Sequence, residues 1–165
     1  MGDGRFSPFE THLDEASALS ILRASVAGAD DGELFLERRR SEALVFDDGR
    51  LRNASYDASE GFGLRAVRGE VAGYGHSTEI SEAALKRASE TARLAVGDGG
   101  GTLAAPPAGT NTKLYTDADP MLDATFGLKV ETLREIDAFS RDLDPRVVQV
   151  SATIAASDAL ALRRP

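Results

Sequence analysis

The chain has 165 residues, 42% hydrophobic and 28% charged, which is ordinary for a single soluble globular domain with a real core. It contains no cysteine, which excludes disulfides and thiolate zinc sites, and its net charge of −8 disfavours binding to nucleic-acid phosphates. No apolar run approaches the roughly 18 residues that cross a bilayer, and no secretory signal opens the chain, so we expect a cytoplasmic protein without membrane contact.

The first expected element is a helix near the N-terminus. Ser7-Pro8-Phe9-Glu10 has the form Ser-x-x-Glu with proline at the first helical position, which is a capping-box signature. Asp14 is a competing start. Gly28 is a suitable stop, and the apolar positions between them share one helical face: Ala18, Leu19, Leu22 and Val26.

A strand is expected next at residues 33–39, followed by a pair of strands within 42–57. Asp48-Gly49 is a strong signal for a two-residue type I′ hairpin, because both central positions of that turn need positive φ. Polar residues alternate with apolar ones in these segments, so one face of the sheet should be exposed to solvent. The basic run Arg38-Arg39-Arg40 lies between two glutamates, and we interpret it as a solvated strand face rather than a nucleic-acid patch.

Residues 60–81, EGFGLRAVRGEVAGYGHSTEIS, hold five glycines in 22 positions. A dinucleotide fingerprint would need glycine where Ala66 stands and a helix beginning there, and a P-loop would need Gly-Lys-Ser/Thr. A hairpin fits better: Gly69-Glu70 suits a glycine-first turn, and one strand face carries Phe62, Leu64 and Ala66. Glycines inside strands usually mark bulges or a close backbone approach.

The second half predicts two more helices and a strand. Residues 80–96 form a helix capped by Ser81, with a small-residue stripe of Ala84, Ala88, Ala92 and Ala95. A flexible loop rich in glycine and proline follows at 97–112. A third helix is predicted from about residue 126 to 143, and a strand is predicted at residues 146–157. The chain is thus one α+β domain, 1–165, with about three helices packed on a mainly antiparallel sheet, in which about five strands precede the helix at 80–96 and one more strand follows at 146–157.

No catalytic residue or metal ligand is recognisable. A catalytic zinc normally takes three protein ligands, and neither His12 nor His76 has a second histidine three to five residues away. Each has a glutamate three residues on, a pairing that is common by chance. The serine-hydrolase motif Gly-x-Ser-x-Gly is absent. The acidic clusters TDADP and DLDP are interpreted as turn formers and helix caps.

Three stretches carry a resemblance to a known family: the strand pair around Asp48-Gly49, the segment GFGLRAVRGEVAGYG and the helix opening EIS that follows it. In this order and spacing the chain resembles the N-terminal domain of the TldD/PmbA family over roughly residues 12 to 155. LYTDADP is similar to the TldD branch in particular. The tail SATIAASDALALRRP departs from the family, where further strands are expected.

The resemblance implies a function. The family is described as zinc metallopeptidases, also called modulators of DNA gyrase, that process peptide precursors and degrade small unfolded proteins. TldD-like subunits pair with a PmbA (TldE)-like partner around an enclosed chamber. The catalytic His-Glu-x-x-x-His motif belongs to the C-terminal half, which this sequence lacks. We therefore expect no zinc or other cofactor in this chain, zinc only in the missing domain, and no activity of the chain alone.

From this resemblance we expect the glycine-rich hairpin within residues 60–81 to take part in substrate admission and assembly. The residues expected to contact a peptide or partner are Gly61, Gly63, Arg65, Gly73, Gly75 and, more weakly, His76. A twisted hairpin without a binding role is the simpler explanation of the glycines, and Gly63→Val should then lower the melting temperature. Two other functions stay open: a regulatory module that pairs with a PmbA-like subunit or with itself, and a small hydrolase that uses Asp and Glu alone.

Overall fold

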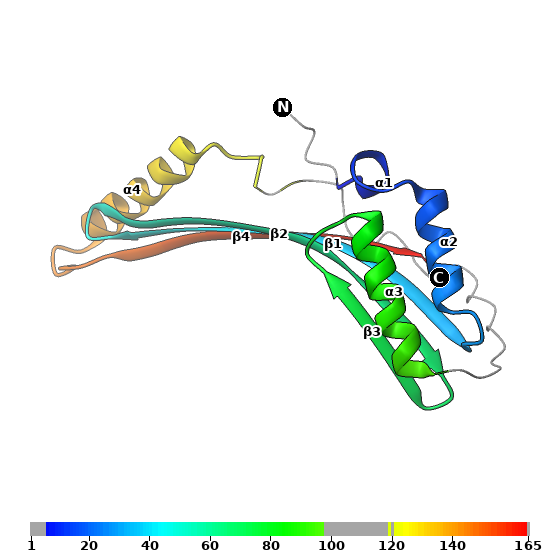
Figure 1. Cartoon of the computed structure of the whole chain (residues 1–165). Helices are drawn as coiled ribbons and strands as arrows, with labels where there is room; N and C mark the ends of the chain where they lie inside the picture. The colour runs from blue at the N-terminus through cyan, green and yellow to red at the C-terminus, as the bar shows by residue number, and fades with distance from the viewer. Residues whose placement is uncertain (1–5, 98–118, 120, 165) are drawn as a thin grey trace, which may run out of the picture. The chain divides into compact units, whose positions relative to one another are not determined.

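The computed structural model describes residues 6–97, 119 and 121–164 (Figure 1). They form one four-stranded sheet in the order β3-β2-β1-β4, and the α+β class with about three longer helices on an antiparallel sheet is confirmed. The elements in chain order are α1 (Pro8–Thr11), α2 (Glu15–Ser25), β1 (Asp31–Asp47), β2 (Arg50–Arg68), β3 (Val71–Ser77), α3 (Glu82–Val96), α4 (Phe126–Leu143) and β4 (Ser151–Arg164). The expected loop at 97–112 lies, apart from Gly97, outside the described residues.

The strands are fewer and longer than the sequence predicts. The strand expected at 33–39 and the first strand of the pair expected within 42–57 are one strand of 17 residues, β1, and the chain returns in one strand of 19 residues, β2. The polar residues between the apolar runs do not interrupt these strands, because the ladder is held by backbone hydrogen bonds and not by side chains. The tail is also a strand, since β4 starts at Ser151 and continues for 14 residues.

Both hairpin turns have the expected backbone. Asp48 and Gly49 have φ of 49° and 76°, as a type I′ turn requires, so the Asp-Gly signal is confirmed. Gly69 has a φ of 57° at the head of the turn between β2 and β3, where Arg68 pairs with Val71. These two turns fix the register of the first three strands.

Both expected helix starts near the N-terminus are used. Ser7 precedes the four-residue α1 but makes no side-chain cap, whereas the Asp14 carboxylate accepts a hydrogen bond of 2.7 Å from the Ser17 backbone N–H at the start of α2. That backbone hydrogen bond lowers the pKa of Asp14. Ser81 caps α3 in the same way, accepting from the Ala84 N–H at 3.1 Å, as predicted.

The described residues fall into two compact units. Unit 1 contains those of Met1–Arg38, Ser59–Leu114 and Leu160–Pro165, and unit 2 those of Arg39–Ala58 and Tyr115–Ala159. In unit 1, α2 and α3 cover one face of the sheet (Figure 1), and the buried core joins helix and strand residues, including Leu22, Leu34, Leu36, Leu64 and Leu85. In unit 2, α4 packs on its strands through Leu44, Phe46, Val130 and Leu133. No helix in the described ranges is long and apolar enough to cross a membrane.

Candidate functional site

The glycine hairpin in unit 1 has two different faces. Phe62, Leu64 and Ala66 are buried against the helices, as their alternation predicts. The residues between them therefore point to the opposite face, which no described helix of unit 1 covers. On that face Gly63 pairs with His76 and Arg65 with Tyr74, and such cross-strand partners have Cβ positions about 5 Å apart.

Gly73 and Gly75 lie on the helix side of β3. A Cβ added at Gly73 would stand 2.2 Å from the carbonyl oxygen of Ala92, and one added at Gly75 would stand 2.2 Å from that of Ala88. The absence of side chains lets α3 rest directly on the strand, and Ala84, Ala88 and Ala92 of the predicted small-residue stripe are buried there. These two glycines therefore serve helix packing.

The other two glycines differ from each other. A Cβ at Gly61 would stand 2.6 Å from the carbonyl oxygen of Ser77, so the backbone approaches closely at that end of the hairpin. A Cβ at Gly63 would meet nothing within 4 Å, and its φ is not in the left-handed region. The expectation that Gly63→Val disturbs the hairpin is therefore wrong, because a valine side chain has both room and a suitable backbone there.

The empty space above Gly63 is part of a hollow of about 320 Å³ on the uncovered face. All four strands contribute side chains to it. Six of those that line it are Glu33 and Phe35 from β1, Arg65 from β2, Tyr74 and His76 from β3, and Arg163 from β4. The structure thus brings Gly63, Arg65, Gly75 and His76 of the predicted set together, and leaves Gly61 and Gly73 outside the lining.

The two arginines in this hollow have N–H donors that are not within hydrogen-bond distance of their neighbouring carboxylates. The Arg65 Nη1 to Asp31 Oδ2 distance and the Arg163 Nη1 to Glu33 Oε2 distance are both 3.9 Å, too long for hydrogen bonds. Arg65 Nε is shielded from solvent and has no hydrogen-bond partner within the described ranges. The Arg163 guanidinium lies over the Phe35 ring, 5.5 Å from its centroid.

Sequence reasoning missed Phe35, Tyr74 and Arg163 as parts of this surface. Strand parity could have found the first two, because Phe35 alternates with buried Leu34 and Leu36, and Tyr74 pairs with Arg65. Arg163 could not be placed in this way. It reaches the hollow only because β4 joins β1 at the sheet edge.

Neither histidine belongs to a group of described side chains that could hold a metal ion. His12 Nε2 lies 3.9 Å from Glu60 Oε1, and both side chains are more than 40% exposed. Within the part of the chain that the structure describes, no three His, Asp or Glu residues gather closely enough to hold a metal ion. The described residues therefore do not fit a catalytic zinc, which the resemblance assigns to the family's C-terminal half.

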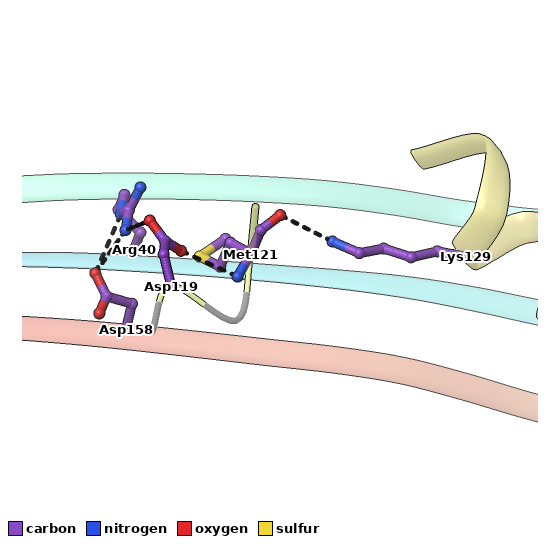
Figure 2. A network of polar contacts seen from close by, with 5 residues as sticks. All are labelled: Arg40, Asp119, Met121, Lys129 and Asp158. Atoms are coloured by element: carbon purple, nitrogen blue, oxygen red, sulfur yellow. Dashed lines mark hydrogen bonds and ion pairs between the residues drawn. The ribbon is translucent and has the colours of Figure 1, made fainter. Parts of the chain in front are cut away.

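The acidic and basic runs meet in unit 2, in a network shown in Figure 2. Arg40, expected to be solvated, has a side chain only 12% exposed, and its Nη2 donates to Asp119 Oδ2 at 2.6 Å and to Asp158 Oδ2 at 2.7 Å. That expectation is wrong for Arg40, since its partners lie 79 and 118 positions away in the sequence. Asp119 also accepts from the Met121 N–H at 3.0 Å, so it is a turn former as predicted.

Two further contacts extend the network. Lys129 Nζ donates to the Met121 carbonyl at 3.2 Å and forms an ion pair with Glu42 (Figure 2 shows the first). The hydrogen bond from Arg40 lowers the pKa of Asp119, and a general acid would need the opposite shift. The lowered pKa of Asp119 is the shift expected of a carboxylate in a structural ion pair.

Comparison with known proteins agrees with the fold and with the resemblance. Residues 32–96 match the description "PmbA/TldA metallopeptidase domain 1". The chain is 29% identical over 128 residues to the metalloprotease TldD homolog of Haemophilus influenzae, covering 76% of this chain, and 26% identical over 129 residues to that of Buchnera aphidicola subsp. Acyrthosiphon pisum, covering 78%. In both cases it spans only 27% of the relative's length.

Solved structures share the fold at low identity. TldE from Thermococcus kodakarensis superposes with a TM-score of 0.65 at 15% identity, covering 89% of this chain and 34% of that one. A candidate modulator of DNA gyrase from Bacteroides thetaiotaomicron gives a TM-score of 0.62 at 15% identity, covering 92% and 36%. The domain match over residues 32–96 and the similarity to the TldD homologs support the resemblance of this chain to the N-terminal domain of the TldD/PmbA family.

Proposed function

We propose that this chain is the substrate-admission and assembly domain of a TldD-like zinc metallopeptidase that cleaves unfolded proteins or peptide precursors, and that it is inactive alone. No three His, Asp or Glu side chains of the described residues gather closely enough to hold a metal ion, and in this proposal the zinc chemistry belongs to the part of the relatives that this chain does not span. Its own contribution would be to receive the extended substrate and to join the assembly.

The observation that carries this proposal is the edge strand β3. Among the described residues it is the last strand of the sheet, and its seven residues, VAGYGHS, contain no lysine, acidic residue or proline, the usual devices that block an edge. An extended peptide can add to such an edge through backbone hydrogen bonds that are largely independent of sequence. We favour β3 over the other edge, β4, because β3 contributes three residues to the lining of the hollow, Tyr74, Gly75 and His76, whereas β4 contributes Arg163 alone.

The first test is titration of the chain with a reduced, carboxymethylated small protein, followed by amide hydrogen exchange. We expect slower exchange in Val71–Ser77, and about tenfold weaker binding for Ala72→Lys, because a charge at this exposed position opposes strand pairing. Ala155→Lys makes the same change at an exposed position of β4 and should leave binding unchanged. Unaltered exchange in β3 would contradict the proposal, as would equal losses in the two variants.

A second candidate function is a non-enzymatic regulatory module that pairs with a PmbA-like subunit. It is favoured by an apolar stripe on α4, away from the side buried by Val130 and Leu133. Leu128, Ile136, Phe139 and Leu143 are 53%, 42%, 65% and 69% exposed, and their spacing places them on one side of the helix. Exposed apolar surface of this kind marks protein interaction sites.

This candidate is tested by gel filtration of the chain with a TldE-like subunit. If the stripe is the contact, Phe139→Ser should weaken the complex at least tenfold, because burial of one large apolar side chain stabilises an interface by about 1.5–3 kcal/mol. Leu94→Ser is the matched control, since Leu94 is 73% exposed on α3. A complex that forms equally well with Phe139→Ser rejects the stripe as the contact, and a homodimer lost in that variant indicates self-association instead.

A further inference from the structure

We infer that the hollow on the uncovered face of unit 1 binds the C-terminal residue of a peptide, with Arg65 holding the terminal carboxylate and the last side chain lying against Tyr74 and Phe35. This rests on the proposed function, because the same face borders the β3 edge that would receive the peptide. It adds the chemical group that is recognised and the residue that recognises it.

The charge of the hollow points to a carboxylate. The chain as a whole carries −8, yet this hollow presents two guanidinium groups, Arg65 and Arg163; one carboxylate, Glu33, lines it, and a second, Asp31, lies beside Arg65. The nearest acidic partners stand 3.9 Å from each guanidinium and leave its donors free for shorter bonds.

Arg65 is the better ligand of the two arginines. Its Nε is shielded from solvent and has no hydrogen-bond partner among the described residues, and a buried donor in that state is costly. Arginine binds carboxylates through two parallel N–H···O bonds, and a small rotation of the guanidinium would let Nε and one Nη share the two oxygens. The guanidinium of Arg163 already lies over the Phe35 ring. It lines one side of the hollow and adds a second positive charge there.

The size and lining of the hollow fit one residue with an apolar side chain. A volume of about 320 Å³ stands at the lower end of the range for small-molecule sites, roughly 300–1,000 Å³. Tyr74 is 61% exposed, which leaves its ring available for an offset or edge-on contact with an aromatic ring. Gly63 keeps the space open, since a side chain there would project into a region with no atom within 4 Å.

The test compares two peptides that differ only at the C-terminus: N-acetyl-Ala-Ala-Phe as the free acid and as the amide. Calorimetry with the whole chain should show the acid binding at least tenfold more tightly. Arg65→Gln should abolish that preference by weakening the acid alone, whereas Arg52→Gln, which removes an exposed arginine from the same strand, should keep it. Gly63→Leu should prevent binding of both peptides while the melting temperature stays at or above that of the wild type.

Each other outcome decides against the inference. Equal affinity for acid and amide would reject carboxylate recognition, while β3 protection by an unfolded chain would still support the proposed function. Unchanged binding in Gly63→Leu would place the peptide elsewhere. Inorganic phosphate that binds as tightly as the acid, and in competition with it, would reduce the hollow to a general anion site. A failure of both peptides to bind would reject it outright.

Discussion

Replacing Gly75 with valine should lower the melting temperature of the protein by about 10 °C. The new Cβ would stand 2.2 Å from the Ala88 carbonyl oxygen, 2.7 Å from its carbonyl carbon and 2.7 Å from its Cα. Those atoms belong to the backbone of α3, so no side-chain rotation can relieve the clash. The helix would have to leave the strand and expose part of the core around Leu85, which is fully buried.

The magnitude follows from overpacking. Extra methyl groups forced into a filled core cost about 1–3 kcal/mol, and contact with rigid backbone belongs at the upper end, about 3 kcal/mol. For a chain of this length 1 kcal/mol corresponds to roughly 2–4 °C in melting temperature. Differential scanning calorimetry or thermal circular dichroism measures the shift.

Gly63→Val is the matched control for this prediction. It makes the same change on the neighbouring strand of the same hairpin, where the new side chain meets nothing within 4 Å. We expect a melting temperature equal to that of the wild type or slightly higher, because valine favours extended backbone more than glycine does. Equal destabilisation by both variants would mean that the hairpin, and not the packing of α3, determines the requirement for glycine.

Replacing Arg40 with methionine should destabilise the protein by about 3 kcal/mol at pH 7. Removal of one partner from a largely buried ion pair costs about 3–5 kcal/mol, because the other charges stay desolvated. The lower value applies here, since the side chains of Arg40, Asp119 and Asp158 are 12%, 20% and 13% exposed and water reaches part of them. Urea unfolding at constant ionic strength measures the loss.

The loss of stability caused by Arg40→Met should become smaller in acid. In the wild type the hydrogen bond from Arg40 lowers the pKa of Asp119 below 3.8, so Asp119 stabilises the fold above about pH 4 and this stabilisation is lost as the pH falls through the folded-state pKa. Without Arg40, the two carboxylates repel each other while ionised, and protonation relieves the repulsion. The stability difference between wild type and variant should therefore shrink from pH 7 to pH 3.

Arg146→Met provides the contrast. Arg146 also pairs with a carboxylate, that of Asp144 at 2.5 Å, but its side chain is 89% exposed. Exposed pairs contribute little to stability, so we expect no measurable change in the urea midpoint. If the two arginine variants were equally stable, the Arg40 network would not hold unit 2 together.

Features encoded within a few residues could be predicted from the sequence. The Asp48-Gly49 turn, the caps at Asp14 and Ser81 and the buried alternation of Phe62 and Leu64 are all as expected. Each depends on hydrogen bonds or side-chain directions set by its immediate neighbours. The family resemblance also depends on such local segments in a fixed order, and the domain match over 32–96 agrees with it.

Features that join distant segments could not be predicted. Gly63, Gly73 and Gly75 look alike in the sequence, yet only the last two are needed by α3, because only the packed helix places backbone atoms where their side chains would be. Arg40 looked solvated until the fold brought Asp158 of β4 to it, and Arg163 joins the hollow from the same strand. Whether the two compact units act as one domain stays a prediction.

The sequence by itself determined the turns, the helix starts, the strand faces and the family resemblance of this protein, since these follow from short segments of the chain. The tertiary structure alone decided which glycines are needed for helix packing, which charged side chains form ion pairs and where the hollow lies on the uncovered face. The physical reason is that close contact, burial and charge pairing depend on distances between segments, and the residue pattern of one segment does not contain those distances.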